Sequence, residues 1–296
     1  MADRKLLQIQ QMSAHPGPIA GQGMARVEEL CKLIDTTTCI GCKACEVACV
    51  EWNDMPFQPT MFDNTYQTMP DTNWNYWNLI KFNEVSNDDG SFQWLMRKHQ
   101  CMHCADPGCL AACPADGAIV QYTNGVVDFQ QDRCIGCGYC ITGCPFNIPK
   151  LSKKTAKVYK CTLCVDRVSV GLEPACIKAC PTGCLQFGSK ADLLLSAQHR
   201  VDQLKANGFA NAGIYDPPGV GGTGVVTVLA HADQPELYRL PKDPGVPMAV
   251  TLWKSPIKWL GNFGMIAGVV IATLHYLRYG PKHVPEEPGK AGTAAG

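Results

Sequence analysis

Eighteen cysteines in 296 residues constrain this chain more than any other feature, because sixteen of them fall into four short runs. The clearest run lies between Asp132 and Pro145 and has the spacing C-x-x-C-x-x-C-x-x-x-C-P, given by Cys134, Cys137, Cys140 and Cys144. Three thiolates at such short intervals can surround one [4Fe–4S] cluster, and the fourth, at a helical offset, points towards a second cluster. Gly136 and Gly138 permit the tight turn, because neither carries a Cβ atom. The alternatives for one run alone are a zinc knuckle and a disulfide knot.

The other three runs repeat this arrangement with altered gaps. Run one is followed by Val50 where a proline is usual, and consists of Cys39, Cys42, Cys45 and Cys49. Run two is stretched by the turn sequence Ala-Asp-Pro-Gly, and consists of Cys101, Cys104, Cys109 and Cys113. Run four has eleven residues in its middle gap, and consists of Cys161, Cys164, Cys176 and Cys180. Sixteen cysteines match the ligands of four clusters.

The segment between runs two and three predicts how the runs pair. Two apolar stretches within residues 117–129 flank Thr123-Asn-Gly125, which is typical of a β-hairpin with an Asn-Gly turn. A run, a hairpin and a second run form a two-cluster module of the bacterial ferredoxin kind. Runs one and four then pair around this inner module, which predicts an α+β fold with two nested ferredoxin-like modules. A sequential pairing is the alternative, but a long insertion separates runs one and two.

On the nested pairing, the distal cysteine of each run serves the neighbouring cluster, which gives four ligand sets. The expected ligands are Cys39, Cys42, Cys45 and Cys180 for set 1; Cys161, Cys164, Cys176 and Cys49 for set 2; Cys101, Cys104, Cys109 and Cys144 for set 3; and Cys134, Cys137, Cys140 and Cys113 for set 4. We expect each set to bind one [4Fe–4S] cluster through iron, and we expect no catalytic residue. Cys31 and Cys184 fall outside the runs and are interpreted as ordinary buried thiols.

These modules define the expected domain organisation. The expected parts are an N-terminal arm at 1–31, a four-cluster domain at 32–250, a transmembrane helix at 255–280 and a flexible tail at 281–296. The inner module covers about 97–148, and the outer module about 32–50 and 155–190. The arm has no apolar segment of signal-peptide type, and a flexible end is its simplest interpretation.

Elements outside the runs carry no site in this interpretation. The insertion at residues 51–100 packs over the clusters or against a partner, and its aromatic residues are Trp52, Trp74, Trp77 and Trp94. Strands are expected at 32–35, 184–187 and 225–229, and a helix at 190–207 that Gly208 ends. Residues 219–224 match the dinucleotide pattern G-x-G-x-x-G but precede a strand instead of following one. We therefore reject nucleotide binding there.

The C-terminal region predicts a membrane helix. Residues 257–279 are almost entirely apolar or small, and their length is close to the ~20 residues that span a bilayer. Gly261, Gly264 and Gly268 provide small residues for close helix contact, and aromatic residues lie at both ends. Flanking basic residues are equal in number on the two sides, so they do not indicate the orientation. His275 near the helix end is assigned no role.

Charge excludes one class of partner and singles out one group of residues. Lysine plus arginine and aspartate plus glutamate each number 26, and this balance argues against nucleic acid as a partner.

Five lysines precede run four: Lys150, Lys153, Lys154, Lys157 and Lys160. A solvated basic face is the simple interpretation. The alternative is that their charge raises the reduction potential of an adjacent cluster.

The four runs with these gaps resemble the iron–sulfur subunits of molybdopterin oxidoreductase complexes. The single C-terminal helix narrows the resemblance to the beta subunits of membrane-bound respiratory formate dehydrogenases. So do the segments Cys101-Met-His-Cys-Ala-Asp-Pro-Gly-Cys109, Cys161-Thr-Leu-Cys-Val-Asp-Arg-Val-Ser-Val-Gly171 and His231-Ala-Asp-Gln-Pro-Glu-Leu-Tyr238. The resemblance extends from about Lys32 to the end of the helix, and all sixteen ligand positions are cysteine.

The resemblance implies an electron-transfer subunit that is not itself an enzyme. Its partners would be a molybdopterin or tungstopterin alpha subunit that oxidises formate, and a haem b gamma subunit in the membrane that reduces quinone. The family member is anchored in the cytoplasmic membrane with its bulk on the periplasmic side, and is exported with a twin-arginine alpha subunit. Partnership with an enzyme acting on thiosulfate, polysulfide or dimethyl sulfoxide is an alternative.

Two other classes of function are less consistent with the sequence. A radical enzyme would need a cluster with one open iron and hence three cysteines, whereas four complete sets are present. A zinc-stapled scaffold is the remaining class, and metal analysis distinguishes it from an iron–sulfur protein.

Overall fold

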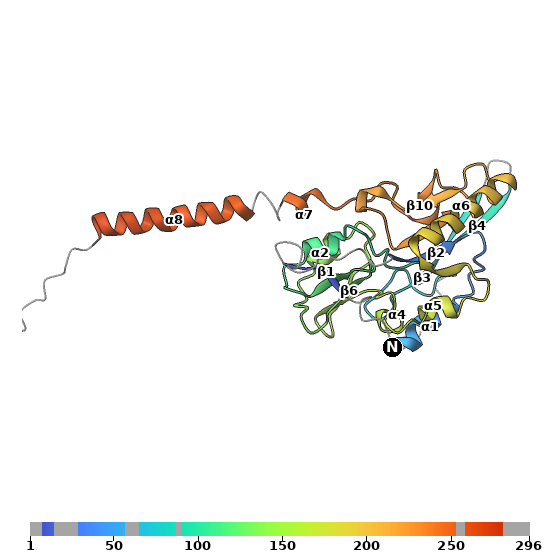
Figure 1. Ribbon diagram of the computed structural model, residues 1–296, viewed down its shortest axis with the longest axis horizontal. Coiled ribbons are helices and arrows are strands. Elements are labelled where there is room, and N and C mark those ends of the chain that lie inside the picture. The colour runs from blue at the N-terminus through green and yellow to red at the C-terminus, as the bar shows by residue number, and fades with distance from the viewer. Residues whose placement is uncertain (1–7, 15–28, 57–64, 87–89, 253–257, 281–296) are drawn as a thin grey trace, which may run out of the picture. The chain divides into compact units, whose positions relative to one another are not determined.

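The computed structural model describes residues 8–14, 29–56, 65–86, 90–252 and 258–280. Contacts divide the chain into two compact units, residues 1–251 and 252–296 (Figure 1). The first unit mixes short helices with small sheets, as the α+β prediction requires. Its short helices are α1 (Ala44–Trp52), α2 (Gly108–Ala112), α3 (Tyr139–Thr142), α4 (Val165–Val168) and α5 (Ala175–Lys178), with 3-10 turns η2 (Pro218–Val220) and η3 (Pro235–Tyr238).

A four-stranded sheet and one long helix form the largest element of the first unit. The strand order is β10 (Gly213–Tyr215), β11 (Val225–Leu229), β2 (Leu30–Asp35) and β9 (Leu185–Ser189). Strands β11 and β2 are parallel, and the other pairs are antiparallel. Helix α6 (Lys190–Ala206) packs on this sheet, and Gly208 follows it with a φ of 95°. The strands and the helix expected from the sequence are therefore confirmed here.

Side-chain alternation in β2 gives the sheet two different faces. Cys31 and Leu33 pack with Leu193 and Val201 of α6 in one apolar core. Lys32 and its alternate neighbours point to the opposite face, where the Lys32 ammonium lies 3.1 Å from Cys176 Sγ. Because successive residues of a strand face opposite sides, one strand thus separates an ordinary core from the cysteine-rich region.

A three-stranded sheet of order β1-β5-β6 lies in the region of runs two and three. Strands β5 (Ile119–Tyr122) and β6 (Val127–Phe129) form the expected hairpin. Strand β1 (Ile9–Met12) pairs with β5, and the fully buried Ser13 donates to the Ala115 carbonyl at 2.6 Å. Residues 9–12 are therefore a strand of a sheet, which differs from the flexible arm expected at 1–31. The rest of that arm before Glu29 lies outside the described residues.

The insertion between runs one and two contains a β-hairpin, β3 (Leu79–Ser86) and β4 (Phe92–His99). Glu46 of α1 fixes this insertion, because its buried carboxylate accepts hydrogen bonds from Thr68, Tyr76 and the Ile80 amide. Not all tryptophans of the insertion pack inside this unit, because the side chains of Trp52 and Trp94 are 44% and 39% exposed to solvent. A second small hairpin consists of β7 (Lys150–Ser152) and β8 (Lys157–Tyr159).

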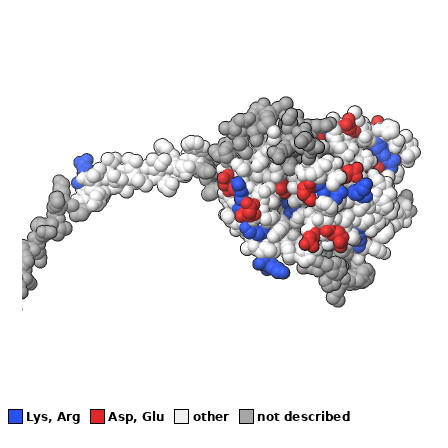
Figure 2. Space-filling model, turned by 60° about the horizontal axis from the view of Figure 1, so that its bottom comes forward, with Lys and Arg blue, Asp and Glu red and all other residues white. Residues whose placement is uncertain are grey.

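The second unit contains helix α8 (Lys258–Tyr279), and α7 (Met248–Leu252) lies at the boundary of the two units. The segment from Trp259 to Tyr279 is long and apolar enough to cross a membrane, and none of its most hydrophobic window is buried. Its single charged residue is Arg278, so the helix is almost entirely uncharged in the space-filling view (Figure 2). The expected tail at 281–296 lies outside the described residues.

Candidate iron–sulfur cluster sites

Two pairs of short helices bring the cysteine runs together. Helix α1 packs against α5, and α2 packs against α3. Helix α1 belongs to run one and α5 to run four, whereas α2 belongs to run two and α3 to run three. The structure therefore brings run one to run four, and run two to run three.

The α2–α3 contact depends on two glycines. A Cβ on Gly143 would lie 2.5 Å from the Gly108 carbonyl oxygen and 2.7 Å from the Ala112 Cβ. No side chain fits between these backbones, so the two helices approach as closely as glycine allows.

Each run folds its first two cysteines together by the same backbone turn. The residue immediately before the second cysteine has a positive φ in all four runs: Gly41 at 65°, His103 at 47°, Gly136 at 70° and Leu163 at 57°. This turn aims the amide of that residue back at the first thiol. The amides of His103 and Leu163 donate to Cys101 Sγ and Cys161 Sγ, each at 3.4 Å.

Two of these turns are strained. The left-handed conformation costs a residue with a Cβ about 1–2 kcal/mol, so His103 and Leu163 maintain it at a cost that glycine avoids. Such strain persists only where the surrounding structure imposes it, and it is common at ligand-binding sites.

Set 1 lines a cavity that is partly open to solvent, with about 370 Å³ of empty space including that open part. Its four cysteines are joined at the wall by a fifth, Cys184, and by Lys98. Within the set, Cys45 is buried, Cys39 and Cys180 are half-buried and Cys42 is exposed. Cys184 was expected to be an ordinary buried thiol. It is buried, but it lies at the wall of this cavity.

Set 3 lines a second cavity, also partly open to solvent, with about 350 Å³ of empty space including that open part. All four of its cysteines line the wall, together with His103 and Lys160. Each of these two sets therefore lines a single cavity.

Sets 2 and 4 are grouped by the electrostatic interactions among their thiols. Burial raises the pKa of Cys140 to about 12, and the neighbouring thiols Cys113, Cys134 and Cys137 add to the rise. Burial likewise raises the pKa of Cys49, and the thiols that add to the rise are Cys161, Cys176 and Cys164. The same kind of interaction also joins neighbouring sets, as between Cys45 and Cys176 and between Cys101 and Cys161. The four ligand sets therefore stay a prediction with which this arrangement is consistent.

The chemistry of these groups fits iron–sulfur clusters. Iron of a [4Fe–4S] cluster is held by cysteine thiolates, and each set offers four cysteines. Burial raises the pKa of Cys45 and Cys101 to about 11 each.

Buried lysines provide an independent test of fit. Lys32, Lys98 and Lys160 are each about 2% exposed or less. Lys32 donates to Cys176 Sγ, and Lys160 donates to the carbonyls of Val127 and Cys161. The Lys98 ammonium at the set 1 cavity has no hydrogen-bond partner. An unpaired buried cation is very unfavourable, and an iron–sulfur group with four thiolates supplies the negative charge that these lysines lack.

The sequence anticipated one of these lysines and missed two. Lys160 belongs to the basic group before run four, and its burial favours the interpretation that it acts on an adjacent site. Lys153 and Lys154 are exposed, as a solvated face would be. Lys32 and Lys98 carried a weaker signal, which is a lysine placed inside a strand among residues that are buried.

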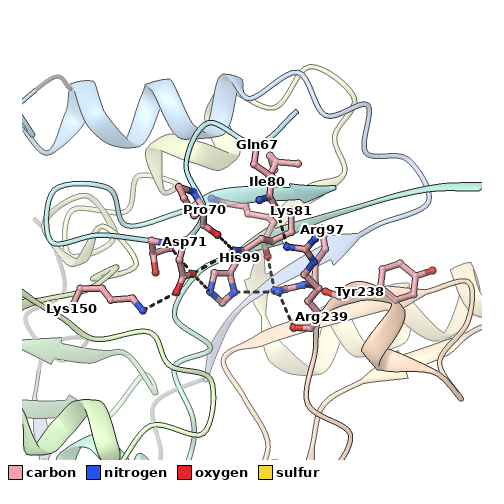
Figure 3. A network of polar contacts seen from close by, with 12 residues as sticks. Gln67, Pro70, Asp71, Ile80, Lys81, Arg97, His99, Lys150, Tyr238 and Arg239 are labelled. Carbon is pink, nitrogen blue, oxygen red and sulfur yellow. Dashed lines mark hydrogen bonds and ion pairs between the residues drawn. The ribbon is translucent and has the colours of Figure 1, made fainter. Parts of the chain in front are cut away.

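A polar network ties the insertion to strand β7 and to the turn η3 (Figure 3). The Asp71 carboxylate accepts from Lys150 at 2.8 Å and lies 3.3 Å from His99 Nε2 and 3.5 Å from Lys81. His99 also contacts Arg97, which donates to the Tyr238 carbonyl at 2.6 Å. Burial would raise the pKa of Asp71, but the contacts with His99 and Lys150 outweigh it and hold this pKa well below its usual range.

Comparison with known families defines the class of protein. Residues 38–118 and 92–190 each match a 4Fe-4S dicluster domain family. Residues 246–288 match the family described as formate dehydrogenase N, transmembrane. These matches confirm a protein with two ferredoxin-type dicluster domains and iron–sulfur clusters, and they indicate that helix α8 anchors it in a membrane.

Three relatives narrow the class. The chain is 56% identical over 255 residues to the formate dehydrogenase iron-sulfur subunit of Haemophilus influenzae, covering 86% of this chain and 81% of the relative. It is 56% identical over 254 residues to the nitrate-inducible formate dehydrogenase iron-sulfur subunit of Escherichia coli, covering 86% of each. It is 54% identical over 263 residues to the formate dehydrogenase-O iron-sulfur subunit of Escherichia coli, covering 88% and 87%. The chain belongs to the family of formate dehydrogenase iron–sulfur subunits.

Proposed function

We propose that this protein is the electron-transfer subunit of a formate dehydrogenase complex and catalyses no reaction itself. Electrons would come from a molybdopterin or tungstopterin catalytic subunit and leave to a haem b membrane subunit that reduces quinone. The observation that carries this proposal is the gathering of sixteen cysteines into four sets. The names and high identity of the relatives support formate as the substrate of the complex.

Each set would hold one [4Fe–4S] cluster, with the ligands assigned above. The clusters supply one-electron transfer when bound. The chain's own residues hold the thiolates in position, exclude water from most of them and place cations beside them. The amides at His103 and Leu163 donate to thiol sulfur, which is one of the ways in which a protein sets a cluster's potential.

The contacts between sets support the order 1, 2, 3, 4. Sets 1 and 2 meet where α1, which carries a cysteine of each, packs against α5, and sets 3 and 4 meet where α2 packs against α3. Cys101 of set 3 interacts electrostatically with Cys161 of set 2, and Lys160 interacts with both. This link joins the two middle sets.

Exposure supports the same order, because electrons must enter and leave at its ends. All four thiols of set 2 are buried, whereas set 1 has the exposed Cys42 and set 4 the exposed Cys137. Exposed apolar side chains lie next to both, with Ile40 at 60% and Ile135 at 66%. We propose that these two ends contact the catalytic and the membrane subunits.

The proposed location is the cytoplasmic membrane, with one crossing by α8 and the bulk of the chain on the periplasmic side. The length of α8 and the match of residues 246–288 support the membrane anchor. The periplasmic side rests on the resemblance to the respiratory enzymes.

Anaerobic purification of the complex from membranes tests the proposal. We expect about sixteen iron atoms per chain, partners that include a pterin enzyme and a haem protein, and reduction of the clusters when formate is added. Reduction would be followed by electron paramagnetic resonance. Iron-free protein, zinc in place of iron, or clusters that formate does not reduce would each contradict it.

A further inference from the structure

One cysteine that the proposed function does not use lies at the wall of the set 1 cavity. Cys184 is 4% exposed and is the fifth cysteine lining this cavity. Its Sγ lies 3.5 Å from Cys180 Sγ, and Cys39 lines the same cavity. The remaining cysteine outside the four sets, Cys31, packs against α6 in a separate core.

The local fold explains why these two thiols meet. The segment Cys180-Pro-Thr-Gly-Cys184 turns back on itself, with Gly183 at a φ of 65° and its amide directed to the Cys180 carbonyl at 3.4 Å. The Cys184 carbonyl accepts from the Asp35 amide of β2 at 2.8 Å. Cys184 is thus fixed by the sheet, whereas Cys180 lies in the turn and is half-buried.

Lys98 provides a second observation that points to a ligand in this cavity. Lys98 lines the same cavity and is only 2% exposed to solvent. Its buried ammonium group has no hydrogen-bond partner. A thiolate ligand at either Cys180 or Cys184 would complete the same anionic group beside it. The cation therefore fits either choice of ligand.

We propose that Cys184 is a reserve ligand of set 1, able to replace Cys180 as the fourth thiolate on the bound cluster. The inference rests on the function proposed above. In the exchange, the bond from iron to Cys180 Sγ breaks and a bond from iron to Cys184 Sγ forms. The proton of the Cys184 thiol passes to the departing Cys180 thiolate. The total charge and the oxidation states stay the same, and no other reactant is needed.

Set 3 offers a matched comparison within the same chain. Cys144 occupies in set 3 the position that Cys180 occupies in set 1, because each is the distal cysteine of its run. The set 3 cavity is lined by its own four cysteines, with no further cysteine among its described lining residues. Loss of Cys144 therefore leaves no substitute thiol.

The test uses the whole complex, purified anaerobically with Cys180→Ala, Cys184→Ala, both together, or Cys144→Ala. Iron and sulfide content and the electron paramagnetic resonance signal of a [3Fe–4S] cluster are measured. We expect the Cys180→Ala complex to keep about sixteen iron per chain and to show no [3Fe–4S] signal. The double variant and Cys144→Ala should each show one such signal or lose one cluster.

Equal signals from Cys180→Ala and the double variant would overturn the proposal. A second measurement covers the case in which Cys180→Ala does not assemble. During mild oxidation, the Cys184→Ala complex should convert one cluster to the [3Fe–4S] form several-fold faster than the unaltered complex, and an unchanged rate would overturn the proposal. Failure of the proposed function is distinguishable, because the unaltered complex would then lack four clusters.

Discussion

The outer module, with sets 1 and 2, and the inner module, with sets 3 and 4, hold their cysteines alike and surround them differently. Both use a pair of short helices and the same left-handed turn. In the outer module, strand β2 of the four-stranded sheet places Lys32 at the thiols, and strand β4 of the insertion hairpin places Lys98 there. In the inner module, Lys160 reaches set 3, whereas set 4 is contacted by the half-exposed Lys157 through the Cys134 carbonyl. The turns within each run thus determine where the cysteines lie. The elements that pack beside the runs determine which charged side chains surround them.

The largest expected effect comes from breaking the inner helix pair alone. Gly143→Leu would place a side chain where the Gly108 carbonyl and Ala112 lie. We expect α2 and α3 to separate and both inner clusters to be lost, leaving about eight of about sixteen iron atoms. Gly188→Ala is the control, because a Cβ there meets only an ordinary contact at 3.9 Å. Full iron content in Gly143→Leu would show that the close approach is not required.

An intermediate effect, on the reduction potential of one cluster, is expected when a buried lysine that is present only in the outer module is replaced. Lys98→Met removes a positive charge at set 1, and reduction adds negative charge there. The potential of that cluster should fall by on the order of 100 mV, from Coulomb interaction at short range in a protein interior. Potentiometric titration followed by electron paramagnetic resonance measures it. Lys153→Met, at an exposed lysine, should leave all four reduction potentials unchanged. An equal shift in both variants would show that the buried position of Lys98 has no special effect on the cluster.

The smallest effect is expected in the polar network around Asp71, which lies in the insertion between the two halves of the comparison. Asp71→Asn should lower the free energy of unfolding at pH 7 by about 1 kcal/mol, because solvent screens this partly exposed carboxylate. Since the folded-state pKa of Asp71 is depressed, its contribution is present above about pH 4 and is lost as the pH falls below that value. Thermal unfolding at pH 7 and pH 5 should give equal differences between variant and parent. A difference that shrinks between these pH values would contradict the assignment.

The sequence predicted much of the site because local spacing determines it. Cysteine intervals and the Asn-Gly hairpin led to the two run pairings that the helices display, and the strand at 225–229 was placed correctly. These features depend on residues close together in the chain. The family matches confirm dicluster domains, while the ligand sets and the nested domain boundaries remain predictions.

Long-range packing explains what the sequence did not reveal. Ser13 and β1 complete a sheet with residues about one hundred positions away, and no local pattern announces that pairing. Lys32 and Lys98 have ordinary sequence neighbours, and their burial beside thiols arises only when distant runs meet. Cys184 is similar, since it lines the same cavity as Cys39, which lies at the other end of the outer module in the sequence.

Helix α1 carries cysteines of two proposed sets, which has a consequence for how iron is gained and released. Cys45 and Cys49 lie one turn apart on α1, yet under the proposed ligation they serve different clusters. Unravelling this helix would free a thiolate from each neighbour at once. Slow chelation of iron should therefore empty the protein two clusters at a time, and half-loaded modules should be rare among its intermediates.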